Sequence, residues 1–204
     1  MDLGLKSGQF DLVTHVCGAI ATLCEGEILQ NDKANRQEMT RASYLDIIYK
    51  KTACLIGVSA SAGALAVGAS REKQALMRKF GESIGMAFQI QDDLLNLVGT
   101  KEAKEKDYRS DITEGKRTLV VVHALQNTTK RERLVEILSS KETDPAILEE
   151  AVSIMREAGS IDYARAYAEK LTANAQERLA KILPESKMRD LLASMADWFV
   201  DRLK

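Results

Sequence analysis

The scarcity of proline is the feature that most constrains what this chain can fold into. Only Pro145 and Pro184 interrupt 204 residues, and a proline inside a helix removes an N–H donor and clashes with the preceding turn. Helix-forming residues dominate the segments between turn signals. The sequence therefore predicts an all-α fold, a single domain over residues 1–204 built as an antiparallel helical bundle around a central cavity.

Apolar periodicity and turn residues divide the chain into expected helices. Polar residues 31–41 form an expected loop, residues 68–70 a turn, and the charged residues 99–116 a second loop. The valine-rich segment 118–125 has a strand-like composition, but a lone strand would lack a partner, so we expect a helix there. The expected helices cover residues 10–30, 43–65, 72–97, 118–125, 130–139, 145–158, 161–182 and 185–203.

Several helix boundaries in the C-terminal half have a chemical explanation. Asp144 is placed to cap a helix that begins at Pro145, where a missing N–H costs nothing. Gly159 is placed to end that helix, and we expect Ser160 to cap the next. The last helix has one apolar face, which we expect to pack in the core: Met188, Leu191, Leu192, Met195, Trp198 and Phe199.

The charge balance argues against a nucleic-acid-binding protein. Lysine and arginine number 29 against 30 acidic residues, a net charge of −1, whereas nucleic-acid binders usually carry a basic excess. The three cysteines show no C-x-x-C spacing and read as reduced thiols. No apolar run is expected to reach the length of a membrane span, and the N-terminus lacks a signal-peptide pattern. These observations predict a soluble, cytoplasmic protein.

The segment from Phe88 to Asn96 holds the only adjacent aspartates of the chain, Asp92 and Asp93. Helical spacing places Gln89, Asp92 and Asn96 on one face. Neighbouring carboxylates repel each other, and a divalent cation would relieve that repulsion. A solvated acidic helix end is the plain alternative, but the surrounding apolar residues favour acids that line a cavity. We therefore expect a Mg²⁺ site here.

A second segment, residues 111–118, follows about twenty residues later and supplies cations. Lys116 stands after Gly115, where it can close over a phosphate group. Acids that cannot bind phosphate directly, beside cations that can, suggest a site where Mg²⁺ bridges carboxylate to diphosphate. Taken singly, such lysines are usually solvated surface residues, and only their combination with the aspartate pair is specific.

These motifs, in this order, resemble the trans-isoprenyl diphosphate synthases, the polyprenyl synthetase family. Asp92 and Asp93 match its second aspartate-rich motif, which binds Mg²⁺ opposite the allylic diphosphate. Asn96 stands where that motif often ends in aspartate, and it is the weaker candidate ligand. Gln89 matches a glutamine beside the reacting prenyl chain. The resemblance thus implies a metal site at Asp92, Asp93 and Asn96.

The same resemblance assigns the diphosphate contacts. Residues 49–53 resemble the family's Lys-Thr motif, which places Lys51 and Thr52 near the diphosphate. Lys106 and Lys116 stand where the family has two diphosphate-binding lysines. Gly26 through Gln30 also resembles a helix pattern of the family. By resemblance, the catalytic residues are Lys51, Gln89 and Lys116.

The resemblance implies an isoprenoid synthase-like fold, a homodimer and a prenyltransferase reaction. Mg²⁺ and lysines draw the diphosphate from an allylic diphosphate, and the double bond of isopentenyl diphosphate attacks the resulting carbocation. Loss of a proton then leaves a chain longer by one isoprene unit. Such chemistry needs charge stabilisation in a cavity that excludes water, which would quench the cation.

The family's first aspartate-rich motif, D-D-x-x-D, has no counterpart in this sequence. We therefore expect the chain to represent the C-terminal part of a synthase and to be incomplete as a lone catalyst, completed by another synthase chain. The alternative is a non-catalytic subunit that pairs with and modulates a full-length synthase. A terpene cyclase is disfavoured, because Lys104 falls where its second motif needs an acid. A plain helical bundle with a fortuitous acid pair is disfavoured by the order of the motifs.

Overall fold

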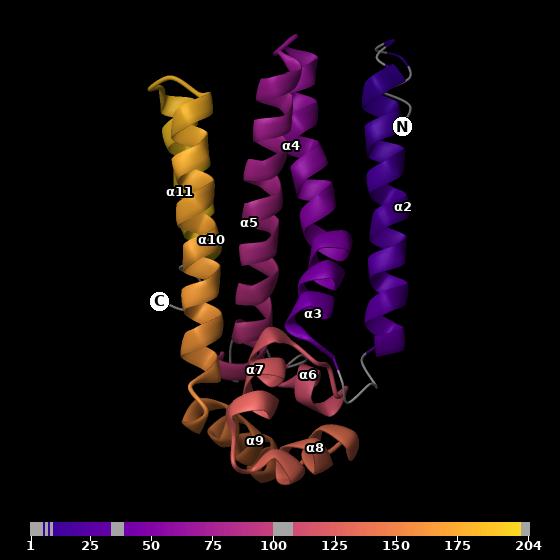
Figure 1. The fold of residues 1–204 in the computed structure, drawn as a ribbon, viewed down its shortest axis with the longest axis vertical. Coiled ribbons are helices and arrows are strands. Elements are labelled where there is room, and N and C mark those ends of the chain that lie inside the picture. Colours follow the sequence, from indigo (N-terminus) through magenta and orange to yellow (C-terminus); the bar gives the residue numbers. More distant parts are fainter. Residues whose placement is uncertain (1–5, 7, 9, 34–38, 100–107, 201–204) are drawn as a thin grey trace.

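The computed structural model describes residues 6, 8, 10–33, 39–99 and 108–200, and these residues form helices and turns without a strand. Long helices stand side by side and alternate in direction, while short helices close one end of the bundle, at the bottom of Figure 1. The all-α fold class is confirmed. The elements are α2 (Phe10–Lys33), α3 (Arg41–Ile48), η1 (Tyr49–Ala53), α4 (Cys54–Ala66), α5 (Arg71–Val98), α6 (Ser110–Thr113), α7 (Leu119–Asn127), α8 (Arg131–Ser139), α9 (Pro145–Glu157), α10 (Ser160–Ile182) and α11 (Lys187–Val200).

The segment expected as one helix over residues 43–65 contains a π-helical turn. The column α3–η1–α4 begins after Thr40, whose hydroxyl caps it by accepting from the Ser43 N–H. Within the turn η1 the Cys54 N–H donates to the Tyr49 carbonyl, five residues back. The sequence predicts one regular helix here, without this extra residue. Such turns frequently occur at functional sites.

The C-terminal boundaries confirm one capping prediction and correct another. The Asp144 carboxylate accepts from the Ala146 N–H at 2.8 Å, and Pro145 begins α9 as expected. Ser160 is not a cap: Gly159, at φ +67°, precedes α10, and Ser160 is its first residue. Its hydroxyl is buried and lies 2.9 Å from Nδ1 of His123, a residue of α7. The hydroxyl therefore contacts a side chain of another helix instead of capping α10. The valine-rich segment is helical, as predicted, in α7.

The largest apolar cluster lies at the closed end of the bundle and supports the C-terminal half of α5. Ile90, Leu94 and Leu97 are each 1% exposed or less. They pack with residues of α7, α8 and α9, including Leu119, Leu134 and Met155. Burial of side chains of this size is worth about 1.5–3 kcal/mol each. The apolar face of α5 is therefore held in the core, and this packing fixes the position of its polar face.

The prediction that the apolar face of α11 packs in the core is wrong for most of its members. Leu192 and Phe199 pack against a small cluster that includes Phe80 and Leu179. The other members are exposed by 46–65% of their surface: Met188, Leu191, Met195 and Trp198. Among the described elements α11 packs mainly against α5 and α10, and one part of its wide apolar face stays exposed.

Helix α2 also carries apolar side chains outward. Phe10 and Ile28 are 72% and 68% exposed. Contrary to the expectation of no such run, Phe10–Asp32 has the length and composition of a membrane span, with only 11% of its most apolar window buried. Core helices of soluble proteins share this length and composition, so this feature alone does not identify a membrane protein.

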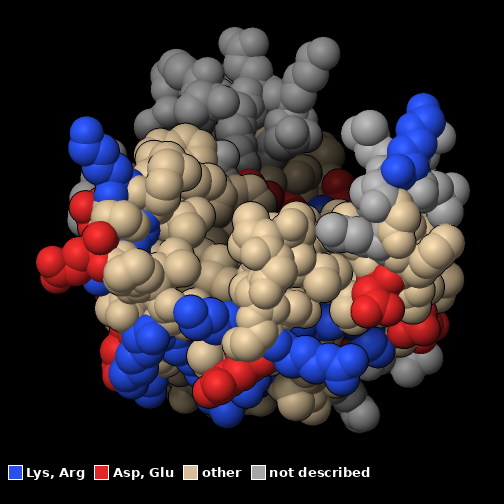
Figure 2. Space-filling model, turned by 90° about the horizontal axis from the view of Figure 1, so that it is seen from above, with Lys and Arg blue, Asp and Glu red and all other residues tan. Residues whose placement is uncertain are grey.

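Figure 2, a view onto the upper ends of the helices, shows charged side chains mainly around the edge of an uncharged centre.

Candidate functional site

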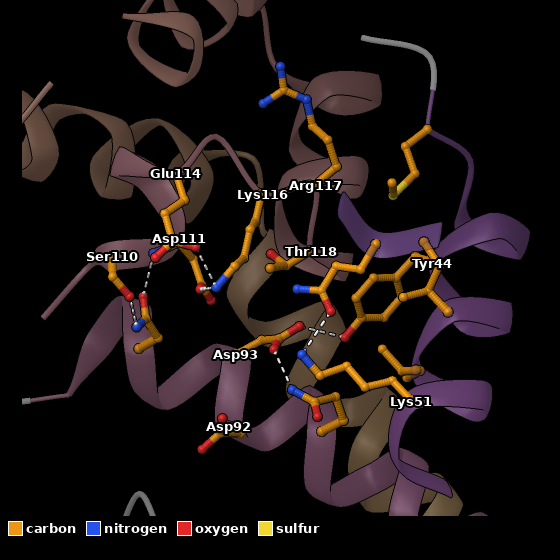
Figure 3. Close-up of a pocket in the computed structure, with 16 residues that line it drawn as sticks. Tyr44, Lys51, Asp92, Asp93, Ser110, Asp111, Glu114, Lys116, Arg117 and Thr118 are labelled. Atoms are coloured by element: carbon orange, nitrogen blue, oxygen red, sulfur yellow. Dashed lines mark hydrogen bonds and ion pairs between the residues drawn. The ribbon is translucent and has the colours of Figure 1, made fainter. Parts of the chain in front are cut away.

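A cavity of about 280 Å³ opens beside the C-terminal half of α5, where the predicted site residues meet (Figure 3). Helices α2, α3 and α5, the turn η1, and the segment 110–118 all contribute to its wall. This segment joins the cavity through α6 and the loop before α7. The lining residues are Gln30, Met39, Tyr44, Ile47, Ile48, Lys51, Gln89, Asp92, Asp93, Asn96, Ser110, Asp111, Glu114, Lys116, Arg117 and Thr118.

Asp93 is held by two hydrogen-bond donors from different helices. The buried Tyr44 hydroxyl donates to Oδ2 at 2.7 Å, and the Gln89 amide donates to Oδ1 at 3.0 Å. Burial, together with the negative charges of Asp111 and Asp92, raises the pKa of Asp93 to about 7, although the two donors oppose the rise. Burial and the charge of Asp93 likewise raise the pKa of Tyr44. Asp93 is thus a tightly oriented acid in a negative environment.

Gln89 connects this acid to the π-helical turn. Its carbonyl oxygen accepts from the Thr52 hydroxyl at 2.8 Å while its amide donates to Asp93. Since an amide can accept and donate at once, Thr52, Gln89 and Asp93 form one chain of hydrogen bonds across two helical elements. The chain fixes the orientation of the glutamine that the sequence predicted at the site.

Asp92 and Asn96 take different positions from Asp93. Asp92 lines the cavity, is partly exposed, and points in another direction from the α5 axis than Asp93 does (Figure 3). Asn96 is only 6% exposed; its amide donates to Ser110 Oγ at 3.0 Å and its carbonyl accepts from the Asp111 N–H at 3.2 Å. Asn96 therefore anchors the start of α6, a role that a spacing argument does not reveal.

Lys51 reaches the cavity from the π-helical turn. Its ammonium donates to Gln30 Oε1 at 2.9 Å and lies 3.4 Å from Glu27 Oε1, both on α2. The neighbouring Lys50 turns elsewhere and pairs with Asp46 at 3.2 Å. Lys51 thus lines the cavity, with α2 as its support, while Thr52 is not among the lining residues and contacts the site through Gln89.

Lys116 reaches the cavity from the opposite side, beyond Asp93 in the view of Figure 3. Its ammonium lies 2.8 Å from Asp111 Oδ1 and 2.9 Å from Glu114 Oε2. Burial would lower the pKa of Lys116, but the bonds to Asp111 and Glu114 outweigh it and raise the pKa. Burial raises the pKa of Asp111, against the opposing effect of Lys116. Lys106, the other predicted lysine, lies outside the described residues.

The sequence argument missed several cavity residues. Tyr44 looked like an ordinary helix residue, Gln30 was noted only as part of a helix pattern of the family, and Asp111 looked like part of a charged loop. Arg117 was missed as well: it is 5% exposed, its Nη1 donates to the Gly115 carbonyl at 3.3 Å, and its Nε has no hydrogen-bond partner among the described residues. Burial lowers the pKa of Arg117. The sequence signal that could have identified Asp111 is its five-residue spacing to Lys116, with which it forms an ion pair in the structure.

The donor set suits Mg²⁺ held jointly with a phosphate ligand. Within the described residues no group of three or more His, Cys, Asp or Glu side chains is close enough to hold a metal by itself. Mg²⁺, however, is usually bound by one or two carboxylates, with substrate phosphates and water as further ligands. The carboxylates of Asp92 and Asp93 both line the cavity and fit that pattern, and a cation would favour the ionised form of Asp93, whose pKa is raised by burial and by the charges of Asp111 and Asp92.

Comparison with known proteins agrees with this geometry. The profile of a family described as Polyprenyl synthetase matches residues 2–155. The chain belongs to the polyprenyl synthetase family. It is 38% identical over 204 residues to a short chain isoprenyl diphosphate synthase of Methanothermobacter thermautotrophicus, covering 97% of this chain and 62% of the relative. A geranylfarnesyl diphosphate synthase of Natronomonas pharaonis is 39% identical over 180 residues, covering 88% of this chain and 51% of the relative.

Solved structures show the same fold over nearly the whole chain. A decaprenyl diphosphate synthase from Rhodobacter capsulatus superposes with a TM-score of 0.90 at 30% identity, covering 100% of this chain and 63% of that one. A polyprenyl synthase from Caulobacter crescentus, solved with calcium and isoprenyl diphosphate, gives 0.91 at 28% identity, covering 98% of this chain and 62% of that one. The chain therefore spans less than two thirds of the length of these relatives.

Proposed function

We propose that this chain carries the allylic-diphosphate half of a Mg²⁺-dependent prenyltransferase that extends an allylic diphosphate with isopentenyl diphosphate. The observation that carries the proposal is the cavity lined by Asp92 and Asp93, with Lys51 and Lys116 on either side of Asp93. The names of the relatives, which are isoprenyl diphosphate synthases, support the substrate class. The Caulobacter structure holds a divalent cation together with isoprenyl diphosphate, which supports the pairing of ligands.

In this proposal each residue has a defined task. Lys51, Thr52, Lys106 and Lys116 bind the diphosphate oxygens, the lysines through charge-assisted hydrogen bonds. Asp92 and Asp93 hold Mg²⁺, with Asn96 as a candidate third ligand. When bound, Mg²⁺ supplies positive charge that offsets the charge of the departing diphosphate. Gln89, oriented by Thr52 and Asp93, lies beside the reacting carbon.

The reaction breaks the bond between the allylic carbon and the diphosphate oxygen, whose electron pair leaves with the diphosphate. The double bond of isopentenyl diphosphate then forms the new carbon–carbon bond, and a proton leaves the adjacent carbon. The lysines stabilise charge on the leaving group, which lowers the barrier only if they are held in place beforehand. The hydrogen bonds around Asp93, Gln89 and Lys51 provide that order.

A non-catalytic subunit that pairs with a full-length synthase is the second candidate function. The uncovered apolar residues of α2 and α11, among them Phe10, Ile28 and Trp198, favour a partner. Apolar surface of this kind on a soluble protein commonly marks an interaction site. A homodimer, or completion by another synthase chain, in the cytoplasm belongs to the first proposal, the prenyltransferase.

Incorporation of labelled isopentenyl diphosphate distinguishes the two functions. The purified chain is incubated with Mg²⁺ and an allylic diphosphate, first alone and then with a full-length synthase whose own Asp-Asp-x-x-Asp carboxylates have been replaced. Elongated product in either reaction, abolished by Asp92→Asn in this chain, supports the prenyltransferase. Absence of product in both reactions, with a folded chain that alters the product of an intact synthase, would establish the subunit instead.

A further inference from the structure

Helix α2 approaches the π-helical turn more closely than side chains normally allow. The column α3–η1–α4 lies between α2 and α5 (Figure 1). At Gly26 of α2, an added Cβ atom would lie 2.5 Å from the Lys51 backbone nitrogen and 2.9 Å from the Lys50 carbonyl carbon. Real Cβ atoms essentially never come so near, so any other residue at this place would push the two backbones apart.

Helix α5 supports the same turn from the other side in the same way. At Gly85 an added Cβ would lie 2.6 Å from the Cα atom of Ala53, the last residue of the turn. Ala53 is fully buried, so this contact leaves no room for adjustment. A glycine in a helix interior costs about 1 kcal/mol relative to alanine. Two such residues against one π-helical turn indicate that its position matters.

The turn sets where the diphosphate-binding side chains emerge. Gly26 lies against the backbone that joins Lys50 to Lys51, and Gly85 lies against Ala53, the residue after Thr52. One turn further along α2, Gln30 accepts the hydrogen bond from the Lys51 ammonium. Helix α2 thus contacts Lys51 through the backbone at Gly26 and through the side chains of Glu27 and Gln30.

We propose that Gly26 and Gln30 are positioning residues of the diphosphate site. Gly26 lets α2 lie against the π-helical turn and so places Lys51, and Gln30 holds its ammonium at the cavity. The inference rests on the proposed function, because it assigns α2 a task in diphosphate binding. A purely structural role would predict loss of stability without a change at Lys51.

Gly26→Ala has a matched control in Gly18→Ala. Both glycines lie on α2 and gain the same helix propensity, but a Cβ at Gly18 meets nothing within 4 Å. Inorganic diphosphate with Mg²⁺ is titrated calorimetrically, the side-chain ¹⁵Nζ signal of Lys51 is recorded, and hydrogen exchange of residues 49–54 is measured. We expect Gly26→Ala to weaken binding at least about tenfold, shift the Lys51 signal and speed exchange, and Gly18→Ala to change none of these.

Gln30→Met keeps the length of the side chain and removes the acceptor, so it tests the proposal without a backbone clash, even if Gly26→Ala fails to fold. We expect diphosphate affinity to fall about three- to tenfold, a shifted Lys51 signal and an unchanged unfolding midpoint. If the wild type binds diphosphate and Gln30→Met and a folded Gly26→Ala bind equally well, the inference is wrong. If the wild type does not bind, the proposed function fails, and an unmoved Lys51 signal in the variants would then overturn the inference separately.

Discussion

The two lysines on either side of Asp93 differ in the residues that bind their ammonium groups. Lys51 contacts a neutral amide, Gln30, and one carboxylate, Glu27, that is 45% exposed. Lys116 makes close ion pairs with two carboxylates, and one of them, Asp111, is only 10% exposed. Both lysines are themselves 28% exposed, so the difference lies in their partners.

This difference indicates which lysine can bind a phosphate without first breaking close ion pairs. Lys51 has a single carboxylate partner, 3.4 Å away and 45% exposed, and so gives up less when a diphosphate arrives. Lys116 must weaken contacts with Asp111 and Glu114, so part of its attraction to diphosphate is offset. In return, Lys116 neutralises Asp111 and so contributes to the stability of the fold. The four predictions that follow test this comparison.

Lys51→Met should have the largest effect on binding. The loss of one charge-assisted contact should weaken diphosphate affinity in the presence of Mg²⁺ by about 10- to 100-fold. The unfolding midpoint should barely change, because the ion pair with Glu27 is largely exposed. Lys50→Met is the matched control, since Lys50 pairs with Asp46 and does not line the cavity. Equal losses in calorimetric titrations of both variants would mean that only overall charge matters.

Lys116→Met should weaken binding less, by about three- to tenfold, and should also destabilise the fold. Because Asp111 would lose its main partner at a buried position, we expect the free energy of unfolding to fall by about 1–2 kcal/mol in denaturant titrations. The double variant Lys116→Met/Asp111→Asn should regain stability but not affinity. If Lys116→Met bound diphosphate as poorly as Lys51→Met and unfolded like the wild type, the proposed difference between the two lysines would be wrong.

Asp93, between the two lysines, should make stability depend on pH. Its pKa is raised to about 7 in the folded state, above that of an unfolded aspartate, so its protonated form stabilises the fold at low pH. That stabilisation is lost as pH rises from about 4 through 7. In EDTA, the stability of Asp93→Asn relative to the wild type should therefore increase by up to about 4 kcal/mol over this range, since a pKa difference of one is worth about 1.4 kcal/mol. A pH-independent difference would show that Asp93 ionises normally.

Arg117 is a third cation at the cavity wall and should have the smallest effect. It makes no ion pair among the described residues, and it turns away from Asp93 in Figure 3. Arg117→Met should leave diphosphate affinity unchanged and raise the free energy of unfolding by up to about 1 kcal/mol, because it removes a buried, poorly satisfied charge. Weaker binding in this variant would instead make Arg117 a third diphosphate ligand.

The sequence predicted much of the fold because helix signals are local. Expected boundaries of α5, α8 and α9 agree with the structure within one residue, and the caps and breakers responsible lie within a turn of each end. The π-helical turn was missed because it depends on contacts with Gly26 and Gly85 from other helices. The exposed face of α11 was missed because periodicity shows that a face is apolar, not that something covers it.

The residues of the candidate site likewise fall into those that the sequence predicted and those that it did not. Motifs with several residues in fixed order predicted Lys51, Gln89, Asp92, Asp93 and Lys116, and the structure brings these residues together around one cavity. Tyr44 and Gln30 could not be predicted, because each acts on a residue distant in sequence. Asn96 was predicted from its spacing to the aspartates, and the structure shows that it also anchors α6.

Calorimetric titration of inorganic diphosphate into this chain, with Mg²⁺ and then with EDTA, tests the central claim most directly. The account predicts saturable binding that requires Mg²⁺ and is lost in Asp92→Asn, because the carboxylates attract the diphosphate only through a cation. Binding of equal strength in EDTA, or binding that Asp92→Asn leaves unchanged, would contradict a site in which acid and phosphate share a metal.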